Sequence, residues 1–160
     1  MNERFDDHAI LIRRMEIAVA IAREGIRAGQ SPFGAAIFSS DGVLIAAAHN
    51  RVRDQRDPTA HAEVVAIRSA CRKIDRKDLR GFSIVSTCEP CPMCAAAITF
   101  AGIREVAFGA SVEDAKAAGY PLLQEPCRAI FDRAGGKFQL RRDLLRERCV
   151  ELFRSAETER

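Results

Sequence analysis

The sequence predicts a three-layer α/β/α domain, with helices on both faces of a mixed central sheet of about five strands. Short apolar runs of strand length alternate with segments whose apolar residues recur at helical spacing. Over residues 82–108 this alternation has the strand-helix-strand form that places two strands in parallel. The 160 residues, 48% of them hydrophobic, can bury one substantial core. We therefore expect a single domain over residues 1–160.

The first half of the chain is predicted to hold two helices and a hairpin. Apolar residues recur at helical spacing over residues 7–28, which indicates an amphipathic helix. The apolar runs 33–39 and 43–48 are predicted to be antiparallel strands, because Gly42 between them accepts the positive φ of a tight turn. A second helix is expected to begin at Asp57-Pro58, with Asp57 as its N-cap, and to end near Cys71.

The second half is predicted to alternate strands and helices. The expected strands span residues 82–87, 103–108 and 137–141, the last of them at a sheet edge. The expected helices span residues 91–100, 112–118 and a final amphipathic stretch around 145–153. Residues 121–136 carry a weaker pattern and are predicted to be irregular or partly helical.

Composition argues against several classes of protein. No stretch approaches the roughly 18 consecutive apolar residues of a membrane span, and the amino-terminal residues do not resemble a signal peptide, so we expect a soluble, cytoplasmic protein. The formal net charge of +3 is far from the basic surface of a dedicated nucleic-acid binder. Three of the six cysteines crowd into residues 88–94, which favours metal binding or reactive thiols over disulfides.

Three residues at predicted helix starts form a candidate metal site. Catalytic zinc typically takes three protein ligands from His, Cys and carboxylate, and it keeps a fourth position open. Cys91 and Cys94 lie three positions apart at a helix start, so both thiolates can face one ion, and the helix N-terminus favours the thiolate form. His61, at another helix start, would supply the third ligand. The sequence therefore predicts one zinc ion per chain.

Glu63 is the predicted acid/base. It follows His61 by two positions, so it would lie near the metal without pointing along the direction of the imidazole. Zinc lowers the pKa of a water molecule to about 7, and a nearby carboxylate can take that proton and return it to a ring nitrogen and a leaving amine. This chemistry needs a carboxylate that moves protons rather than one that binds the metal.

These residues match a known signature. His61-Ala-Glu63 followed by Pro90-Cys91-Pro-Met-Cys94 fits the pattern H-x-E…P-C-x-x-C of zinc deaminases. The chain resembles the cytidine deaminase superfamily, in the branch that holds bacterial guanine deaminases and tRNA adenosine deaminases. The resemblance covers roughly residues 8–120 and includes residues 32–35, 57–63 and 87–90 and Asn50.

The resemblance implies hydrolytic deamination with release of ammonia, with zinc on the three ligands named above and Glu63 as the proton shuttle. It also implies that Asn50 and the backbone N–H of Ala62 hold polar edges of the base and that Phe33 lies against its face. From spacing alone, Asn50 is predicted to cap its own loop and Phe33 to be an ordinary strand aromatic. The resemblance further implies a homodimer, in which a carboxyl-terminal segment can reach the partner's site.

Two other interpretations of the cysteines compete with the enzyme. Cys88, Cys91, Cys94 and His61 could form a closed Cys₃His structural zinc site in a binding module without enzymatic activity. A thioredoxin-like redox pair within residues 88–94 is a second alternative, but it leaves His61 and Glu63 unexplained.

The substrate is less clearly indicated than the chemistry. Bacterial guanine deaminases resemble the chain at Ala118-Gly119-Tyr120, but they typically continue with acidic residues that contact the exocyclic amine of guanine. This chain has Pro121-Leu122-Leu123 there. Another acidic residue would then have to make that contact, and the candidates are Glu113, Asp114 and Glu125.

The tRNA adenosine deaminases share Phe108-Gly109-Ala110 but continue differently and end in a basic helix for the anticodon loop. A surface that follows phosphates would also raise the net charge well above +3. A small-molecule substrate is therefore predicted, either a free nucleobase or a nucleoside, with guanine or a related aminopurine first. The alternatives are adenosine-to-inosine deamination of tRNA and deamination of cytosine or cytidine.

Overall fold

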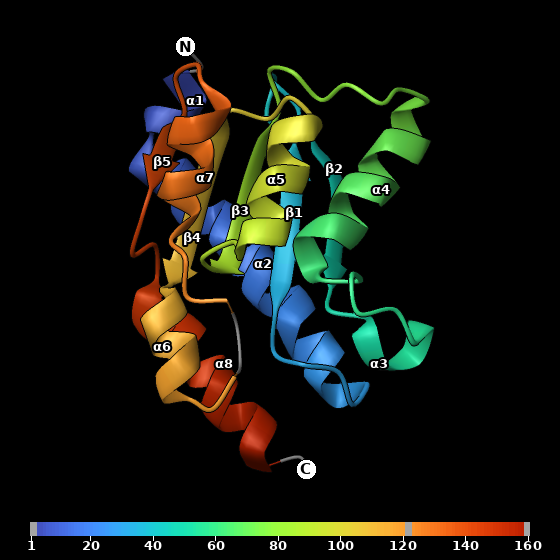
Figure 1. Cartoon of the computed structure of the whole chain (residues 1–160), viewed down its shortest axis with the longest axis vertical. Coiled ribbons are helices and arrows are strands. Elements are labelled where there is room, and N and C mark those ends of the chain that lie inside the picture. Colours follow the sequence, from blue (N-terminus) through green and yellow to red (C-terminus); the bar gives the residue numbers. More distant parts are fainter. Residues whose placement is uncertain (1–2, 121–122, 159–160) are drawn as a thin grey trace.

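A mixed sheet forms the centre of the molecule in the computed structural model, which describes residues 3–120 and 123–158. Its strands are β1 (Gly34–Phe38), β2 (Leu44–His49), β3 (Ser83–Cys88), β4 (Glu105–Ala110) and β5 (Gln139–Arg141). The strand order is β2-β1-β3-β4-β5 (Figure 1). β1 is antiparallel to both β2 and β3, whereas the pairs β3/β4 and β4/β5 are parallel. The predicted mixed sheet and its parallel β-α-β unit are confirmed.

Helices cover both faces of this sheet. They are α1 (Glu3–Asp6), α2 (His8–Arg27), α3 (Val52–Gln55), α4 (Ala62–Ile74), α5 (Pro92–Phe100), α6 (Val112–Ala117), α7 (Cys127–Ala134) and α8 (Arg146–Thr158). α2 and α8 pack on one face, and α4, α5 and α7 lie on the other (Figure 1). The predicted three layers are therefore present. In the described part of the chain, no helix is long and apolar enough to cross a membrane.

The central strands serve two cores because side chains alternate along a strand. In β1, Ala36 and Phe38 pack toward α2 and α8, whereas Ala35 and Ile37 pack toward α4, α5 and α7. All five residues of β1 are buried. A continuous apolar run of this kind is typical of a strand that is covered on both faces.

Two glycines are required by the geometry around β1. Gly42 has a φ of +88° in the hairpin between β1 and β2, as the tight turn requires. Gly34 lies so close to α2 that a Cβ atom there would stand 2.3 Å from the carbonyl oxygen of Ala18. Its N–H donates to the buried hydroxyl of Thr87. The backbone next to Phe33 is therefore held between a helix and the neighbouring strand.

The second predicted helix begins later than expected. Asp57 does not cap it, because its carboxylate accepts hydrogen bonds from the N–H and the hydroxyl of Thr59, at 2.8 and 2.7 Å, and closes a turn instead. α4 starts at Ala62, with His61 in the N-cap position. The predicted start was wrong because an aspartate followed by proline favours a turn as well as a helix.

The regions with weaker patterns are partly regular. Within residues 121–136, α7 forms the helical part, and residues 121 and 122 lie outside the described residues. β4 begins and ends two residues later than predicted. The expected edge strand is present as β5, and the final amphipathic helix as α8.

Candidate metal centre and active site

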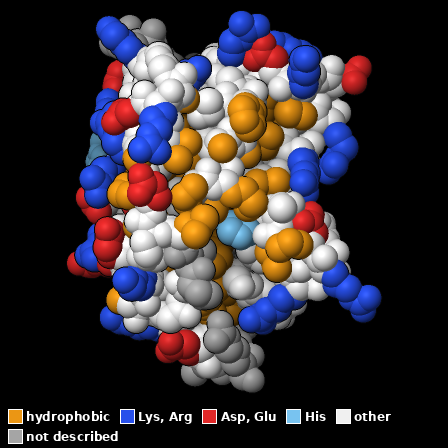
Figure 2. All heavy atoms as spheres, viewed as in Figure 1, with side chains coloured by type: hydrophobic (Ala, Val, Ile, Leu, Met, Phe, Trp, Pro, Cys, Tyr) orange, Lys and Arg blue, Asp and Glu red, His pale blue; other side chains and the backbone are white. Residues whose placement is uncertain are grey.

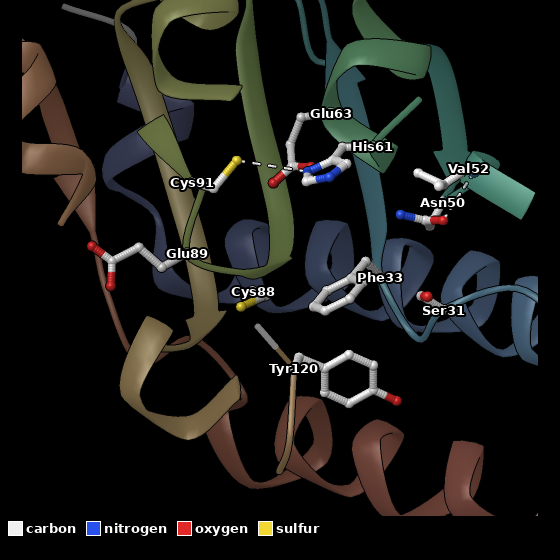
Figure 3. Close-up of a pocket in the computed structure, with 10 residues that line it drawn as sticks. All are labelled: Ser31, Phe33, Asn50, Val52, His61, Glu63, Cys88, Glu89, Cys91 and Tyr120. Atoms are coloured by element: carbon white, nitrogen blue, oxygen red, sulfur yellow. Dashed lines mark hydrogen bonds between the residues drawn. The ribbon is translucent and has the colours of Figure 1, made fainter. Parts of the chain in front are cut away.

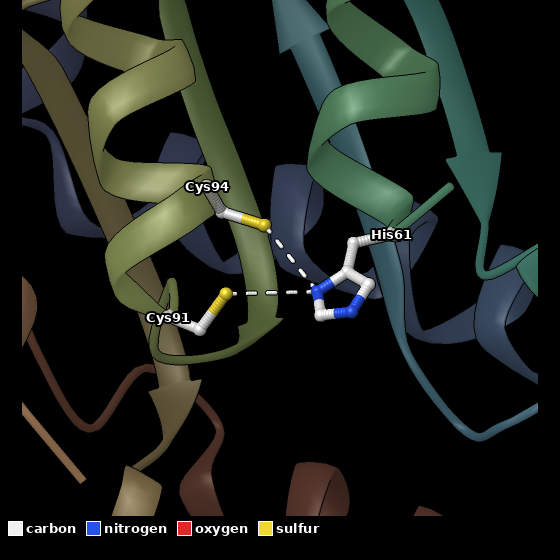
Figure 4. Close-up of side chains that lie close together, drawn as sticks. All are labelled: His61, Cys91 and Cys94. Carbon is white, nitrogen blue, oxygen red and sulfur yellow. Dashed lines mark hydrogen bonds between the residues drawn. The ribbon is translucent and has the colours of Figure 1, made fainter. Parts of the chain in front are cut away.

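His61, Cys91 and Cys94 converge between the starts of α4 and α5 (Figure 4). Nδ1 of His61 lies 3.6 Å from Sγ of Cys91 and 3.5 Å from Sγ of Cys94. A tetrahedral ion with zinc-sulfur and zinc-nitrogen bonds of about 2.3 and 2.0 Å separates sulfur from nitrogen by about 3.5 Å. Both sulfur-nitrogen distances therefore fit a zinc ion held by these side chains.

The two thiols of this site are electrostatically different. The pKa of Cys91 is lowered to about 4, chiefly by the hydrogen bond from the Cys94 thiol. Burial raises this pKa, and the hydrogen bond and charge of His61 lower it. The same contact with Cys91, together with burial, raises the pKa of Cys94 well above its ordinary value. Cys91 therefore favours its thiolate form, whereas Cys94 favours its thiol form. A divalent cation that binds both sulfurs would displace the proton of the Cys94 thiol.

Glu63 lies beside the ligands without belonging to their group. It is the second residue of α4 and is only 5% exposed. Its Oε1 accepts a hydrogen bond from the Ser86 hydroxyl at 3.0 Å, and its Oε2 lies 3.5 Å from the Cys94 thiol. Burial, followed by the negative charge of Cys91, raises the pKa of Glu63 above its ordinary value. Such a carboxyl group suits the transfer of a proton.

A cavity of about 210 Å³ opens next to these residues (Figure 3). Its lining residues are Ser31, Phe33, Asn50, Val52, His61, Glu63, Cys88, Glu89, Cys91 and Tyr120. This volume is smaller than the roughly 300–1,000 Å³ of sites for drug-sized ligands. It suits a single small heterocycle, and no lysine or arginine is among the described residues that line it.

Aromatic rings form one wall of the cavity. The rings of Phe33 and Tyr120 meet edge to face, with centroids 5.3 Å apart (Figure 3). Phe153 of α8 supports both of them, at 5.8 Å from Phe33 and 5.4 Å from Tyr120. The apolar wall therefore depends on residues from three distant parts of the chain.

Asn50 makes the predicted loop cap and also lines the cavity. Its Oδ1 accepts a hydrogen bond from the N–H of Val52 at 3.1 Å, which is the predicted loop cap. Its amide nitrogen points toward the cavity (Figure 3), and the residue is 4% exposed. Ala62 differs, because its side chain is buried away from the cavity lining. Only the N–H of Ala62, at the start of α4, could serve a ligand.

Comparison with known proteins agrees with this geometry. A family model for the zinc-binding region of cytidine and deoxycytidylate deaminases matches residues 10–110. The chain belongs to the cytidine and deoxycytidylate deaminase family. It is therefore a zinc-dependent hydrolytic deaminase, and the non-enzymatic zinc module is not the correct interpretation.

Proteins similar to this deaminase include guanine deaminases and tRNA-specific adenosine deaminases. The guanine deaminase of Bacillus subtilis is 44% identical over 115 residues, which make up 71% of each chain. A tRNA-specific adenosine deaminase from Aquifex aeolicus is 39% identical over 116 residues, 70% of this chain and 75% of the relative. The structure of a guanine deaminase from Nitrosomonas europaea superposes with a TM-score of 0.82 at 31% identity, over 92% of this chain and 84% of that one.

Cys88 lies outside the candidate ligand group of the described residues. It lines the cavity from the end of β3, and its thiol lies 3.7 Å from the carbonyl oxygen of Ser111, to which it donates. Burial raises the pKa of Cys88 well above the ordinary value of a thiol. All six cysteines are free. The candidate ligand group is thus His61, Cys91 and Cys94, and the fourth member of a closed Cys₃His site is absent from it.

The acidic residues proposed to contact an exocyclic amine do not line the cavity. Asp114 accepts hydrogen bonds from the N–H of Ser111 and from the guanidinium of Arg146, so its carboxylate is engaged elsewhere. Glu113 and Glu125 are exposed. None of the three is among the residues that form the cavity.

Sequence reasoning missed Tyr120, Glu89 and Ser86 as parts of the site. Tyr120 stood out only as part of a resemblance, because its contact with Phe33 depends on tertiary packing. Glu89 did carry a recognisable signal, since an acidic residue between a buried strand and a metal ligand requires buried partners.

Proposed function

We propose that this deaminase acts on a free purine base, guanine or a related aminopurine, and releases its exocyclic amine as ammonia. The cavity carries this proposal, because it is small, aromatic on one side and adjacent to His61, Cys91 and Cys94. A nucleotide or an RNA would bring phosphates, which proteins commonly pair with arginine or lysine. The described lining offers neither of these side chains. The 44% identity to a guanine deaminase supports the same choice.

The positions of the chain's own residues support a role for each in the proposed reaction. His61, Cys91 and Cys94 would hold the zinc ion, which supplies a water of lowered pKa as nucleophile at neutral pH. Glu63, oriented at Oε1 by the Ser86 hydroxyl, takes one proton from the attacking water and delivers it to the ring nitrogen; it then carries the second proton, from the added hydroxyl group, to the amine that leaves as ammonia. Burial raises the pKa of Glu63 above its ordinary value, which favours the protonated form that donates as an acid.

Three groups orient the base. Asn50 offers its amide nitrogen to an acceptor on the ring, because its oxygen is already engaged by Val52. The N–H of Ala62, at a helix start, donates to a second polar edge. Phe33 lies against one face of the ring and is held in place by Tyr120.

The substrate assignment predicts a specific screening result. Purified protein should release ammonia from guanine with a kcat/KM at least about a hundredfold higher than for cytosine or cytidine, because the polar groups of the site would fit only one base. An ammonia-release assay over bases, nucleosides and an anticodon stem-loop RNA measures this. Inosine formation in the RNA, without turnover of any free base, would reverse the assignment in favour of tRNA.

We also propose that the deaminase is a homodimer that buries the outer face of α5. This helix is apolar on all sides, and such helices are normally buried all round. Here Phe100 is 88% exposed, and Met93 and Ala97 share its face at helical spacing. Figure 2 shows hydrophobic side chains gathered over this part of the surface. Met93 and Ala97 also pack against Cys91 and Cys94, so the face adjoins the metal site.

A charged substitution tests the dimer. Phe100→Asp should convert a species of twice the 17.6 kDa chain mass into a monomer, because two carboxylates would be buried without partners. Sedimentation or light scattering measures the mass. Val43→Asp is the matched control, since Val43 is 54% exposed and belongs to the hairpin between β1 and β2 rather than to α5. A monomeric parent protein, or a Phe100→Asp variant that remains dimeric, would refute the proposal.

A further inference from the structure

Glu89 is a buried acidic residue that lines the cavity but has no role in the proposed reaction. It follows β3, lies two positions before Cys91 and is 5% exposed. Its N–H donates to the carbonyl oxygen of Ala110 at 2.7 Å, so its backbone is held to the end of β4. Its carboxylate points away from His61 and Glu63 (Figure 3). In the described part of the chain, none of the ion pairs includes it.

The carboxylate of Glu89 instead connects the starts of two helices. Oε2 accepts a hydrogen bond from the N–H of Val112, the first residue of α6, at 3.4 Å. Oε1 accepts one from the N–H of Cys127, the first residue of α7, at 3.1 Å. N–H groups at a helix start have no partner within the helix, so a buried acceptor at this point is strongly favoured.

The α6 helix leads directly to the aromatic wall of the cavity. After α6 the N–H of Tyr120 donates back to the carbonyl oxygen of Ala115 at 3.0 Å, which places the tyrosine relative to the helix. The ring of Tyr120 then meets Phe33 edge to face. A continuous chain of described contacts therefore runs from Glu89 through Val112 and α6 to Phe33.

We propose that Glu89 is a positioning residue that holds α6, and through it Tyr120, against Phe33 at the substrate cavity. This inference rests on the proposed function, because it assigns Glu89 an effect on substrate binding rather than on the chemical step. Each of the two side-chain oxygens of Glu89 accepts a hydrogen bond from one backbone N–H, so the residue serves two donors at once. A glutamine would turn one acceptor into an amide donor that faces a backbone N–H.

The amino-acid composition allows the position of Tyr120 to be monitored without measuring deaminase activity. Tyr120 is the single tyrosine and there is no tryptophan, so intrinsic fluorescence reports on this residue alone. Tyr120 is 7% exposed, and a neutral quencher such as acrylamide should reach it poorly in the parent protein. If Glu89 holds Tyr120 in place, Glu89→Gln should raise the quenching constant at least about twofold. The control Glu113→Gln changes an exposed glutamate in the same helix and should leave the constant unchanged.

Kinetics and metal analysis complete the test on the zinc-loaded enzyme. Glu89→Gln should raise KM for the base about tenfold, the effect of losing one hydrogen bond to a charged group, with kcat within about threefold and full zinc content. Unchanged quenching and KM would overturn the proposal. Lost zinc with unchanged quenching would also overturn it, because Glu89 would then act through Cys91. A parent protein inactive on every base would refute the proposed function but leave the quenching result valid.

A second variant removes the hydrogen bond between Glu89 and Val112 by changing Val112 instead of Glu89. Val112→Pro removes the N–H that donates a hydrogen bond to Glu89. Val112 is the first residue of α6, a helix position at which proline is well tolerated. Ser111 before it already has the extended backbone that a following proline requires. If Glu89→Gln does not fold, Val112→Pro should still raise both the quenching constant and KM. A variant that folds with both values unchanged would contradict the proposal.

Discussion

Glu63→Gln is expected to lower kcat by about 10²–10⁴-fold while the protein keeps one zinc ion per chain. Glutamine has the shape of glutamate and can still accept the hydrogen bond from Ser86, but it cannot take a proton from water or deliver one to an amine. The three candidate ligands do not include Glu63, so metal binding should survive. Ammonia release and elemental analysis of the same sample measure the two quantities.

Ser86→Ala is the graded control for this experiment. It removes the hydroxyl that donates to Glu63 Oε1 but leaves the carboxylate in place, so a loss of about tenfold in kcat is expected. A Glu63→Gln variant as active as the parent would show that another group moves the proton. Loss of zinc in that variant would show that Glu63 supports the metal instead.

The central part of the fold could be predicted because its signals are local. The apolar runs that became β1 and β3, and the helix between β3 and β4, are recognisable within single segments. The start of α4 was misplaced because Asp57 can either cap a helix or close a turn, and the hydrogen bonds to Thr59 decide between the two. Whether Asp57 caps a helix or closes a turn depends on the residues that follow it, and Asp57-Pro58 alone does not determine the outcome.

The metal site was predictable for a related reason. His61, Cys91 and Cys94 lie at helix starts, where residue type and spacing determine which atoms can meet. The cavity was less predictable, since its wall requires Tyr120 and Phe153 to pack around Phe33 from distant parts of the chain. The metal-ligand residues can therefore be predicted from short motifs, whereas the shape of the substrate cavity depends on tertiary packing.

Cys91→Ala is expected to abolish both zinc binding and deamination. Changes in residues that only support metal ligands already cost about 10–100-fold in affinity, and removing one of three ligands should cost more. Zinc that binds only the folded state stabilises it by about 2.7 kcal/mol when free zinc is a hundred times Kd. For a domain of this size, that stabilisation corresponds to a melting temperature about 5–10 °C higher. A chelator should therefore lower the melting temperature of the parent but not that of Cys91→Ala.

Cys88→Ser is the matched control, because it changes a third cysteine of the same motif that lies outside the ligand group. Its zinc content and its response to the chelator should equal those of the parent. Zinc loss comparable to that of Cys91→Ala would mean that Cys88 closes the coordination sphere as a fourth ligand. A closed sphere has no open position for water, and hydrolytic deamination requires one. Zinc retention in Cys88→Ser therefore tests two things: whether Cys88 is a zinc ligand, and whether the zinc ion keeps an open position for the water that deamination requires.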